Sequence, residues 1–284
     1  MINVITQAIL LFATLSDTAL TQHINEHPVT QIPEVTHPYT AANIRENAQC
    51  ALQLELYDSE PNEIYDEDEW FDDYDLPYPE PPVNPDGITV PLQTKYGHLY
   101  FLRRAEMWTV AVYRIACLID SIAQSCNTEF MYTLVVLENT APVKVHAVYN
   151  LSYFYPIILE LCWLEASGDY VYFNAAYNDF AELSRGNTGY LYCLDINTGT
   201  IVWATRNLVS SYYGFTVYDD YILTGYGFTN EDDFLYVIDR FTGKIVQTIP
   251  IKTAHEYILV KGAFCFVRTY NTNYIFRTTH VTQN

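Results

Sequence analysis

The chain has 284 residues, 50% of them hydrophobic, which is enough to build the core of one large or two small domains. Its 34 acidic and 14 basic residues give a formal charge of −20, and this field repels phosphate backbones and anionic membrane surfaces. We therefore expect no nucleic acid partner. We also expect no membrane span, because no apolar run reaches the roughly 18 residues that a spanning helix needs.

Residues 1–54 are expected to form a flexible N-terminal segment, because they show no sustained helical or alternating pattern. The run at 8–15 is long enough for a secretory hydrophobic region, but no basic residue precedes it and no clean cleavage site follows. It favours an extracytoplasmic location without establishing it. Apolar residues three and four positions apart indicate a short helix within 39–56.

A metal-binding pattern occurs in this segment, where residues 23–27 read His-Ile-Asn-Glu-His and fit the His-x-x-Glu-His pattern of inverted zinc peptidases. That chemistry needs both histidines on one face of a helix and a third ligand downstream. Pro28 follows at once and no apolar helical stripe surrounds the pattern. We therefore assign no metal site to His23 and His27.

Residues 55–90 are expected to form an acidic, proline-rich linker, because 13 Asp or Glu lie between positions 55 and 86 and no Lys or Arg occurs from 46 to 94. Calcium binding is one alternative, but residues 66–70 lack the glycine and the closing glutamate of a calcium loop. A second alternative uses the aromatic residues Tyr65, Trp70, Phe71 and Tyr74: the segment docks on a partner or on the domain behind it.

Residues 91–284 are expected to form an all-β domain, because short runs rich in branched and aromatic residues alternate with turn residues. The chain carries 26 tyrosines and 14 phenylalanines, which suit a pleated surface. A helical turn at 115–123 is the one exception that the pattern allows. We expect strands within 98–104, 108–116, 131–138, 143–149, 169–176, 189–195, 200–206, 221–227, 234–240, 244–251, 264–270 and 273–279.

A repeat is present in this domain. The stretch LYCLDINTGTIVW at 191–203 and the stretch LYVIDRFTGKIVQ at 235–247 share seven of thirteen positions at an offset of 44 residues. A repeat of about 40–50 residues made of short strands is typical of a propeller blade, in which four antiparallel strands form one sheet. The cycle starts again near Phe264 but ends without the Asp-x-x-Thr-Gly turn, so the last outer strand is expected to be missing or supplied from elsewhere in the chain.

Two weaker copies lie upstream. Residues 134–145 keep Thr140 but lose the aspartate and the glycine, and the pair of runs at 97–104 and 109–115 resembles a still earlier copy. We therefore predict a β-propeller of about four to five four-stranded antiparallel blades, complete or partial, within residues 91–284.

The repeat resembles that of the PQQ-like β-propeller family, whose pattern is Gly-x-Leu-Tyr-x-Leu-Asp-x-x-Thr-Gly-x-x-x-Trp. The first copy fills every position with Gly189, Leu191, Tyr192, Leu194, Asp195, Thr198, Gly199 and Trp203. The second copy departs from it at Gln247, where tryptophan is usual. The resemblance covers about residues 165–279 and implies a quinoprotein-like fold.

The physical chemistry of the turn accounts for this pattern without catalysis. Asp195 can accept hydrogen bonds from the backbone N–H groups after it, and Gly199 can adopt the left-handed conformation of a tight hairpin. We expect Trp203 to fill the gap between neighbouring blades.

Catalytic signatures are absent from the sequence. The resemblance implies that an enzyme of this family would carry an adjacent Cys-Cys pair, an Asp base and a calcium site in a longer, usually eight-bladed propeller. None of the cysteines at 50, 117, 126, 162, 193 and 265 is adjacent to another or forms a Cys-x-x-Cys pair. Most are expected to be buried apolar residues, and only Cys117 and Cys126 are close enough to suggest a local disulfide.

We therefore assign no catalytic, cofactor-binding or metal-binding residues and expect no cofactor. The expected function is a non-enzymatic binding or scaffold protein whose partner is another protein. A quinoprotein-like oxidoreductase, and a carbohydrate-binding or sensor domain that uses exposed Tyr and Trp, stay open as alternatives. The glycine-, acid- and aromatic-rich loop at 224–234 could contact a ligand, although most such loops are ordinary connections.

Overall fold

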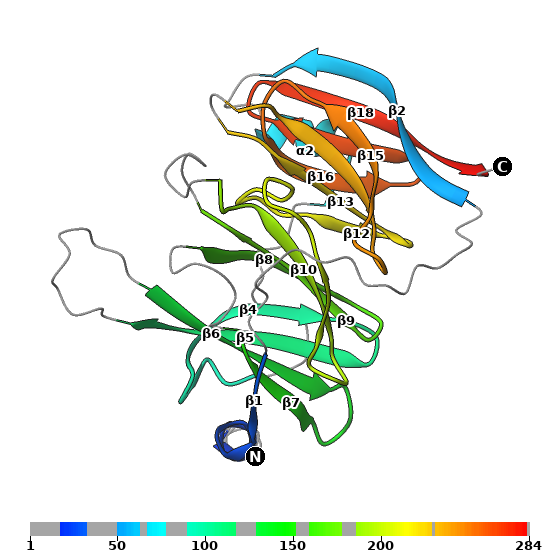
Figure 1. Ribbon diagram of the computed structural model, residues 1–284. Coiled ribbons are helices and arrows are strands. Elements are labelled where there is room, and N and C mark those ends of the chain that lie inside the picture. The colour runs from blue at the N-terminus through cyan, green and yellow to red at the C-terminus, as the bar shows by residue number, and fades with distance from the viewer. Residues whose placement is uncertain are drawn as a thin grey trace, which may run out of the picture.

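The protein consists largely of β-strands, arranged in consecutive sheets (Figure 1). The computed structural model describes residues 18–32, 50–62, 67–77, 90–117, 129–151, 159–177, 186–228 and 231–282. These residues form four sheets, each built around a meander in which neighbouring strands run antiparallel. This is the blade architecture that the repeat predicts, and the predicted all-β fold class is confirmed.

The first sheet contains six strands, of which β4 to β7 form the meander and two short strands lie at its margins. The meander consists of β4 (Gly97–Arg104), β5 (Trp108–Cys117), β6 (Glu129–Glu138) and β7 (Lys144–Asn150). The short strand β3 (Gln93–Thr94) pairs with β4, and β1 (Val29–Gln31) pairs in parallel with β7. The two upstream copies of the repeat therefore belong to one sheet, which brings the number of sheets in the described chain to four.

The second and third sheets are regular four-stranded meanders. The second consists of β8 (Glu160–Ser167), β9 (Tyr170–Ala176), β10 (Tyr190–Asp195) and β11 (Ile201–Ala204). The third consists of β12 (Thr216–Tyr218), β13 (Tyr221–Tyr226), β14 (Phe234–Asp239) and β15 (Ile245–Pro250). The two copies of the repeated stretch are thus the β10–β11 and β14–β15 hairpins.

The fourth sheet takes its outer strand from the N-terminal part of the chain. Three strands come from the end of the sequence: β16 (His255–Lys261), β17 (Phe264–Thr269) and β18 (Thr272–Thr282). The fourth is β2 (Cys50–Pro61), which pairs antiparallel with β18 along its whole length. The missing outer strand of the last blade is therefore supplied from elsewhere in the chain, as the sequence suggested.

This strand corrects two expectations about the N-terminal part. Residues 50–56, expected in a helix, belong to β2 because Leu52 and Leu54 alternate inward and are buried against the third sheet. Residues 55–61, expected in a linker, are exposed strand. Acidic side chains are tolerated there because β2 lies at the edge of its sheet, where charge also discourages pairing with other chains.

The second part of the acidic segment forms a short helix, α2 (Glu67–Asp73), instead of a linker. Trp70 and Phe71 are 3% and 1% exposed and pack with Phe266 against the outer face of the fourth sheet. Of the interpretations open for this segment, docking on the folded domain is the one confirmed here. The Lys261 ammonium holds the end of the helix through the Asp75 carboxylate at 2.8 Å.

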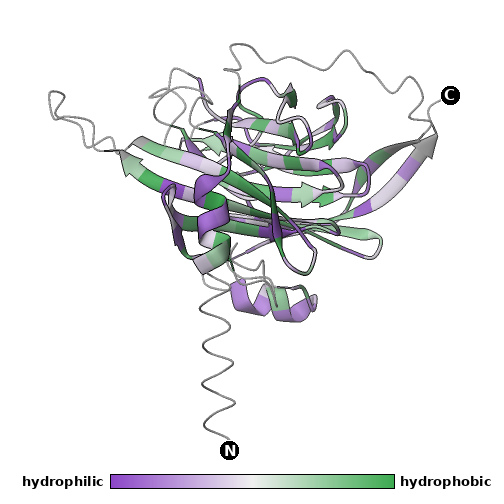
Figure 2. Ribbon diagram, turned by 90° about the horizontal axis from the view of Figure 1, so that it is seen from below, coloured by the Kyte–Doolittle hydropathy of each residue, from purple (hydrophilic) through white to green (hydrophobic). Residues whose placement is uncertain are grey.

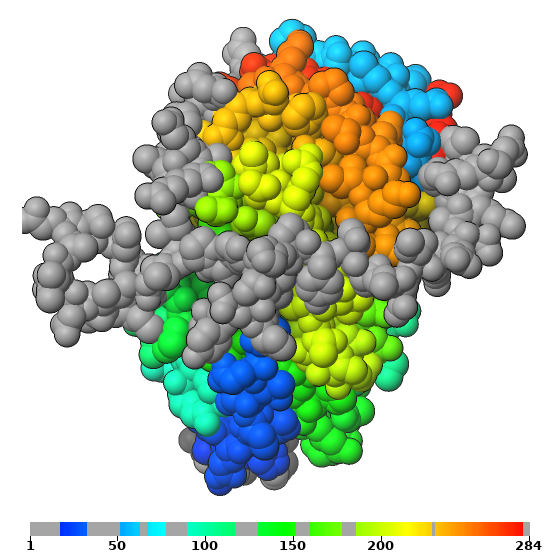
Figure 3. Space-filling view, in the orientation of Figure 1, coloured from blue at the N-terminus to red at the C-terminus, as the bar shows by residue number. Residues whose placement is uncertain are grey.

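A second helical segment, residues 18–26, covers the outer face of the first sheet (Figures 1 and 3). Leu20 and Ile24 are buried there among side chains of β4 to β7. Three further hydrophobic clusters join the first sheet to the second, the second to the third and the third to the fourth. In the part of the chain that is described, no such cluster joins the fourth sheet to the first, so the sheets form an open series with a helix at each end.

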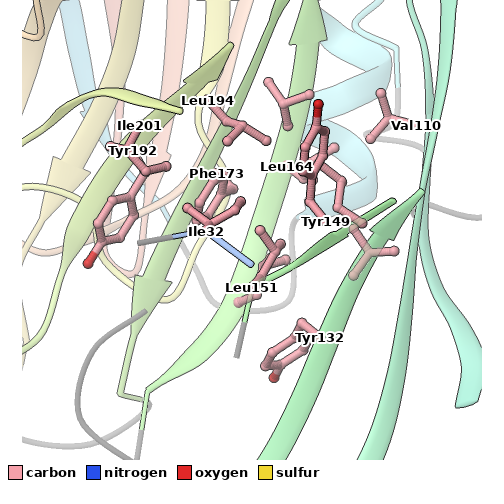
Figure 4. Packing of buried hydrophobic residues seen from close by; sticks show 14 of the residues in the cluster. Ile32, Val110, Tyr132, Tyr149, Leu151, Leu164, Phe173, Tyr192, Leu194 and Ile201 are labelled. Carbon is pink, nitrogen blue, oxygen red and sulfur yellow. The ribbon is translucent and has the colours of Figure 1, made fainter. Parts of the chain in front are cut away.

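The core between the first two sheets shows how alternation produces this stacking (Figure 4). Val110 faces Leu164 and Phe173 of the second sheet, whereas the adjacent Ala111 faces the helical segment at 18–26. Figure 2 shows the same alternation as green and pale or purple bands along the strands. Central strands such as β5 are buried on both faces because one face packs against the next sheet and the other against a sheet or a helix.

The Asp-x-x-Thr-Gly turns have the predicted geometry. The Asp195 Oδ1 atom accepts hydrogen bonds from the N–H groups of Asn197 and Thr198 at 2.9 and 2.8 Å, and Gly199 has a φ of 67°. Asp239 and Gly243 repeat this arrangement, with a φ of 70° at the glycine. The turns are structural elements of the hairpins, as expected.

Each turn receives an aromatic side chain from the preceding sheet. Trp203 is fully buried, lies against Gly243 and donates its indole N–H to the Arg240 carbonyl at 3.0 Å. Tyr149 lies in the same way against Gly199 and donates its hydroxyl to the Ile196 carbonyl at 2.7 Å. The predicted role of Trp203 in sealing neighbouring blades is confirmed.

This packing explains why the second copy carries Gln247 in place of tryptophan. The fourth sheet has no Asp-x-x-Thr-Gly turn, and it presents β2 at that place instead. The Gln247 amide accepts a hydrogen bond from the Leu54 N–H at 2.8 Å and donates one to the Leu54 carbonyl at 3.0 Å. A side-chain amide can hydrogen-bond to both the N–H and the C=O group of a strand residue. An indole at this position would have no glycine turn to pack against.

Candidate functional site

The candidate site is a pocket of about 540 Å³ at one end of the second, third and fourth sheets. Its lining comes from the connections β9–β10, β11–β12, β13–β14, β15–β16 and β17–β18, and from the start of β16. Alternate connections of a meander lie at the same end of a sheet. The Asp-x-x-Thr-Gly turns join β10 to β11 and β14 to β15, so they lie at the opposite end from the pocket.

Aromatic side chains form much of the pocket wall. Two of them stand partly in solvent, with Tyr213 43% and Tyr270 57% exposed. The aromatic lining consists of Tyr177, Tyr212, Tyr213, Tyr226, Phe228 and Tyr270. Rings on connections that a rigid sheet positions are typical of binding surfaces.

The acidic side of the pocket centres on Asp233. Its Oδ1 atom is shielded from solvent and has no hydrogen-bond partner. Burial, together with the nearby carboxylates of Asp232 and Glu231, raises the pKa of Asp233 to about 6, against the opposing effect of a backbone hydrogen bond from Ala254. A positively charged group placed beside this oxygen would be stabilised.

A second oxygen atom without a partner lies in the same lining. Ser211 is 5% exposed, and its Oγ atom makes no hydrogen bond. Buried hydroxyl and carboxylate oxygens normally find partners, so each of these two atoms marks a position where a ligand could supply one.

A buried polar network holds the connection that carries Ser211 and its tyrosines. The Asn174 side-chain amide donates to the carbonyls of Ser211 and Tyr213 at 2.8 and 2.9 Å. His255 is fully buried, and its Nε2 atom lies 2.8 Å from the Gly214 carbonyl, which assigns the proton to Nε2. Burial lowers the pKa of His255 to about 4, so the ring is neutral and acts as a structural donor.

The second acidic residue of the lining, Glu256, forms an ion pair with Arg268. The Arg268 Nε atom lies 3.7 Å from a Glu256 carboxylate oxygen, and the Arg268 guanidinium also lies against the Trp70 ring of α2 at 5.9 Å. Burial raises the pKa of Glu256, whereas Arg268 opposes the shift. The docked helix therefore supports one wall of the pocket.

The first glycine of the repeat pattern also contributes to the pocket. Gly189 has a φ of 73°, and a Cβ atom at this position would lie 2.8 Å from the Tyr226 ring. The Tyr226 hydroxyl donates to Glu231 at 2.7 Å, and burial raises the pKa of the tyrosine. Gly189 thus leaves the room in which the ring of the next sheet packs.

The loop at 224–234, which the sequence marked as able to contact a ligand, supplies four lining residues: Tyr226, Gly227, Phe228 and Asp233. The other lining residues were not singled out, because four further connections far apart in the sequence bring them together. In the sequence, only the dipeptides Tyr212-Tyr213 and Tyr270-Asn271, which lie beside turn residues, could have indicated these parts of the lining.

The remaining motifs lie away from this pocket. His23 is exposed at the helical segment 18–26, and the His27 Nδ1 atom lies 2.9 Å from the Pro28 carbonyl. Among the residues whose positions are described, no group of three or more His, Cys, Asp or Glu side chains is placed so that it could hold a metal ion. Cys193 and Cys265 are buried in the sheets as expected, whereas the segments 8–15 and 63–66 and residue Cys126 fall outside the described residues.

The fold and the pocket define a β-propeller-like protein with a tyrosine-lined site at one end of its sheets. No family model matches the sequence, and no curated protein matches it either. Within the described chain, no helix has the length and apolar character needed to cross a bilayer.

Solved structures give matches at low identity. BamB from Moraxella catarrhalis is 16% identical over 62% of this chain, with a TM-score of 0.40, and the match spans 45% of the BamB chain. The computationally designed Ika4 protein is 11% identical over 69% of this chain and 99% of its own, with a TM-score of 0.41. A europium-containing methanol dehydrogenase is 14% identical over 52% of this chain and 25% of its own, with a TM-score of 0.31.

Proposed function

We propose that this chain is a non-enzymatic binding protein that holds an exposed segment of another protein in the tyrosine-lined pocket. The observation that carries the proposal is the pocket of about 540 Å³, whose wall combines six aromatic rings with two oxygen atoms that have no partner. Aromatic side chains are enriched at protein interfaces, because they provide a large contact area at a low cost in conformational entropy.

The chemistry of the lining favours binding over catalysis. The Ser211 Oγ atom makes no hydrogen bond to a base that would activate it as a nucleophile. Burial raises the pKa of Tyr226, and its hydrogen bond to Glu231 raises the pKa further, so the hydroxyl stays protonated and donates to Glu231. The sequence also lacks the adjacent cysteine pair of quinoprotein alcohol dehydrogenases.

Selection of random peptides displayed on phage tests this proposal. The two targets are the wild-type chain and Ala254→Trp, which places an indole in the pocket at a residue whose side chain is a methyl group. The matched control is Asn197→Trp, which adds the same indole to an exposed turn at the opposite end of the sheets.

We expect peptides that bind the wild type and the Asn197→Trp variant and lose at least about tenfold in affinity for Ala254→Trp, equivalent to about 1.4 kcal/mol. Peptides that bind all three proteins equally, or no enriched peptides at all, would overturn the proposal. A chain that holds stoichiometric quinone in the presence of calcium and reduces a dye with alcohol would also overturn it.

Carbohydrate binding is a second candidate, which the exposed rings of Tyr213 and Tyr270 at the pocket favour, because sugars stack on such rings. A glycan array separates the two candidates. Selective glycan binding that Tyr270→Ala abolishes, without pocket-dependent peptides, would establish carbohydrate as the ligand.

A further inference from the structure

At two places in this protein, an arginine guanidinium lies between an aromatic ring and a carboxylate. The guanidinium of Arg103 lies 4.7 Å from the Trp163 ring centre, while its Nε atom is 3.3 Å from a Glu165 carboxylate oxygen. Arg268 lies between Trp70 and Glu256 in the same manner. The fold therefore builds the same local environment for its own arginines twice.

The pocket offers this environment without an arginine among its described lining residues. Rings form the wall, and the Asp233 Oδ1 and Ser211 Oγ atoms are buried and without partners. The positive side chain among the lining residues is Lys252, which is exposed, whereas Asp233 and Glu256 are both partly buried.

We infer that the occupant of this pocket is an arginine side chain on the partner protein, with its guanidinium paired to Asp233 and stacked on the tyrosine rings. The inference rests on the proposed function and names the chemistry of the partner. A guanidinium fits better than an ammonium, because it is planar, stacks on rings, is weakly hydrated and carries five N–H donors for several acceptors.

Long-range electrostatics support the same partner. The chain carries a net charge of −20, so it attracts positively charged segments and accelerates their association. The nearby Glu231 and Asp232 add to the negative field at Asp233. Ionised Asp233 is disfavoured in the empty pocket, and a bound guanidinium would restore the charged form.

The test uses three nine-residue peptides of alternating Gly and Ser with a central arginine, lysine or citrulline, titrated into the full chain by calorimetry at physiological salt. Citrulline keeps the shape of arginine and removes its charge. Asp233→Asn removes the proposed partner, and Asp232→Asn is the matched control because it removes the same charge from an exposed neighbour.

We expect saturable binding of the arginine peptide, with the citrulline peptide at least about tenfold weaker and the lysine peptide between them. Asp233→Asn should lose about tenfold or more, whereas Asp232→Asn should lose less than about threefold. Thermal melting of both variants shows whether they are folded.

The inference is overturned if the citrulline peptide binds as well as the arginine peptide, if Asp233→Asn binds as the wild type does, or if no binding saturates below about 5 mM. Its failure is distinguishable from that of the proposed function. Displayed peptides that depend on the pocket but lack arginine would keep the protein-binding function and refute arginine. Binding of the arginine peptide that neither Asp233→Asn nor Ala254→Trp weakens would refute both, because the pocket would then not be the binding site.

Discussion

Replacement of Trp203 by alanine should be among the most damaging single changes to the fold. Trp203 is fully buried, with an exposed fraction of 0%, and it lies between the second and third sheets. Burial of a tryptophan contributes about 3–5 kcal/mol relative to alanine, which includes the cavity left behind. The lost bond to the Arg240 carbonyl falls within that range.

This loss corresponds to a fall in melting temperature of about 6–20 °C for a chain of this size. The assay is thermal unfolding followed by circular dichroism. The control is Trp163→Ala, because Trp163 is only partly buried and its indole N–H bonds to Glu165 on its own strand. A Trp203→Ala variant that melts within about 2 °C of the wild type would show that the indole does not hold the second and third sheets together.

Three further predictions concern the pocket residue Asp233, the helix α2 and the repeat position of Gln247. Burial raises the pKa of Asp233 to about 6, so the folded chain binds this proton more tightly than the unfolded chain and loses stability as pH rises from about 4 to 6. Asp233→Asn should therefore melt above the wild type near pH 7.5, with the gap closing near pH 4, as a melting series shows. Phe71→Ala should cost about 3 kcal/mol in urea unfolding, because Phe71 of α2 is 1% exposed and packs against the fourth sheet. Gln247→Ala should cost about 1–3 kcal/mol, because both of its bonds to Leu54 are lost, and proton exchange should become faster in β2.

Each of these three predictions has a contradicting result. An Asp233→Asn variant that melts below the wild type near pH 7.5 would show that the carboxylate stabilises the fold. A Phe71→Ala variant with an unchanged urea midpoint would show that α2 does not contribute to the core. Unchanged exchange in β2 of Gln247→Ala would show that the two bonds do not hold that strand.

The sequence predicted the strands whose burial is strongest. All twelve predicted runs are strands, and the turns around Asp195 and Asp239 have the predicted hydrogen bonds. The runs predicted within 91–284 did not include β8, β12 and β16, each of which lies at one edge of its sheet. Their residues are mostly only partly buried, so no clear alternation distinguishes them from the connections beside them.

The acidic segment shows why non-local structure was missed. Local composition favours a solvated linker, but Leu52 and Leu54 are buried because β2 pairs with a strand more than 200 residues later. In the same way, Trp70 and Phe71 pack only because the end of the chain provides the sheet beneath them. A local sequence pattern does not show which distant segments will pack against it.

The pocket was only partly predictable for the same reason. The loop at 224–234 stood out through its glycines, acids and rings, and it supplies Asp233. Ser211 and Glu256 gave no signal, because their place in the lining depends on neighbouring sheets that lie side by side. Fold signatures are local, whereas this site is assembled from five connections.

Hydrogen exchange of the full chain, measured with and without a peptide selected on the wild type, shows whether the pocket is the binding site. We expect slower exchange in the described parts of 211–213, 226–233 and 252–256, which line the pocket. We expect no change in the turns at 195–199 and 239–243, at the opposite end of the sheets. Protection of those turns, with the pocket connections unchanged, would contradict the assignment of the pocket as the binding site.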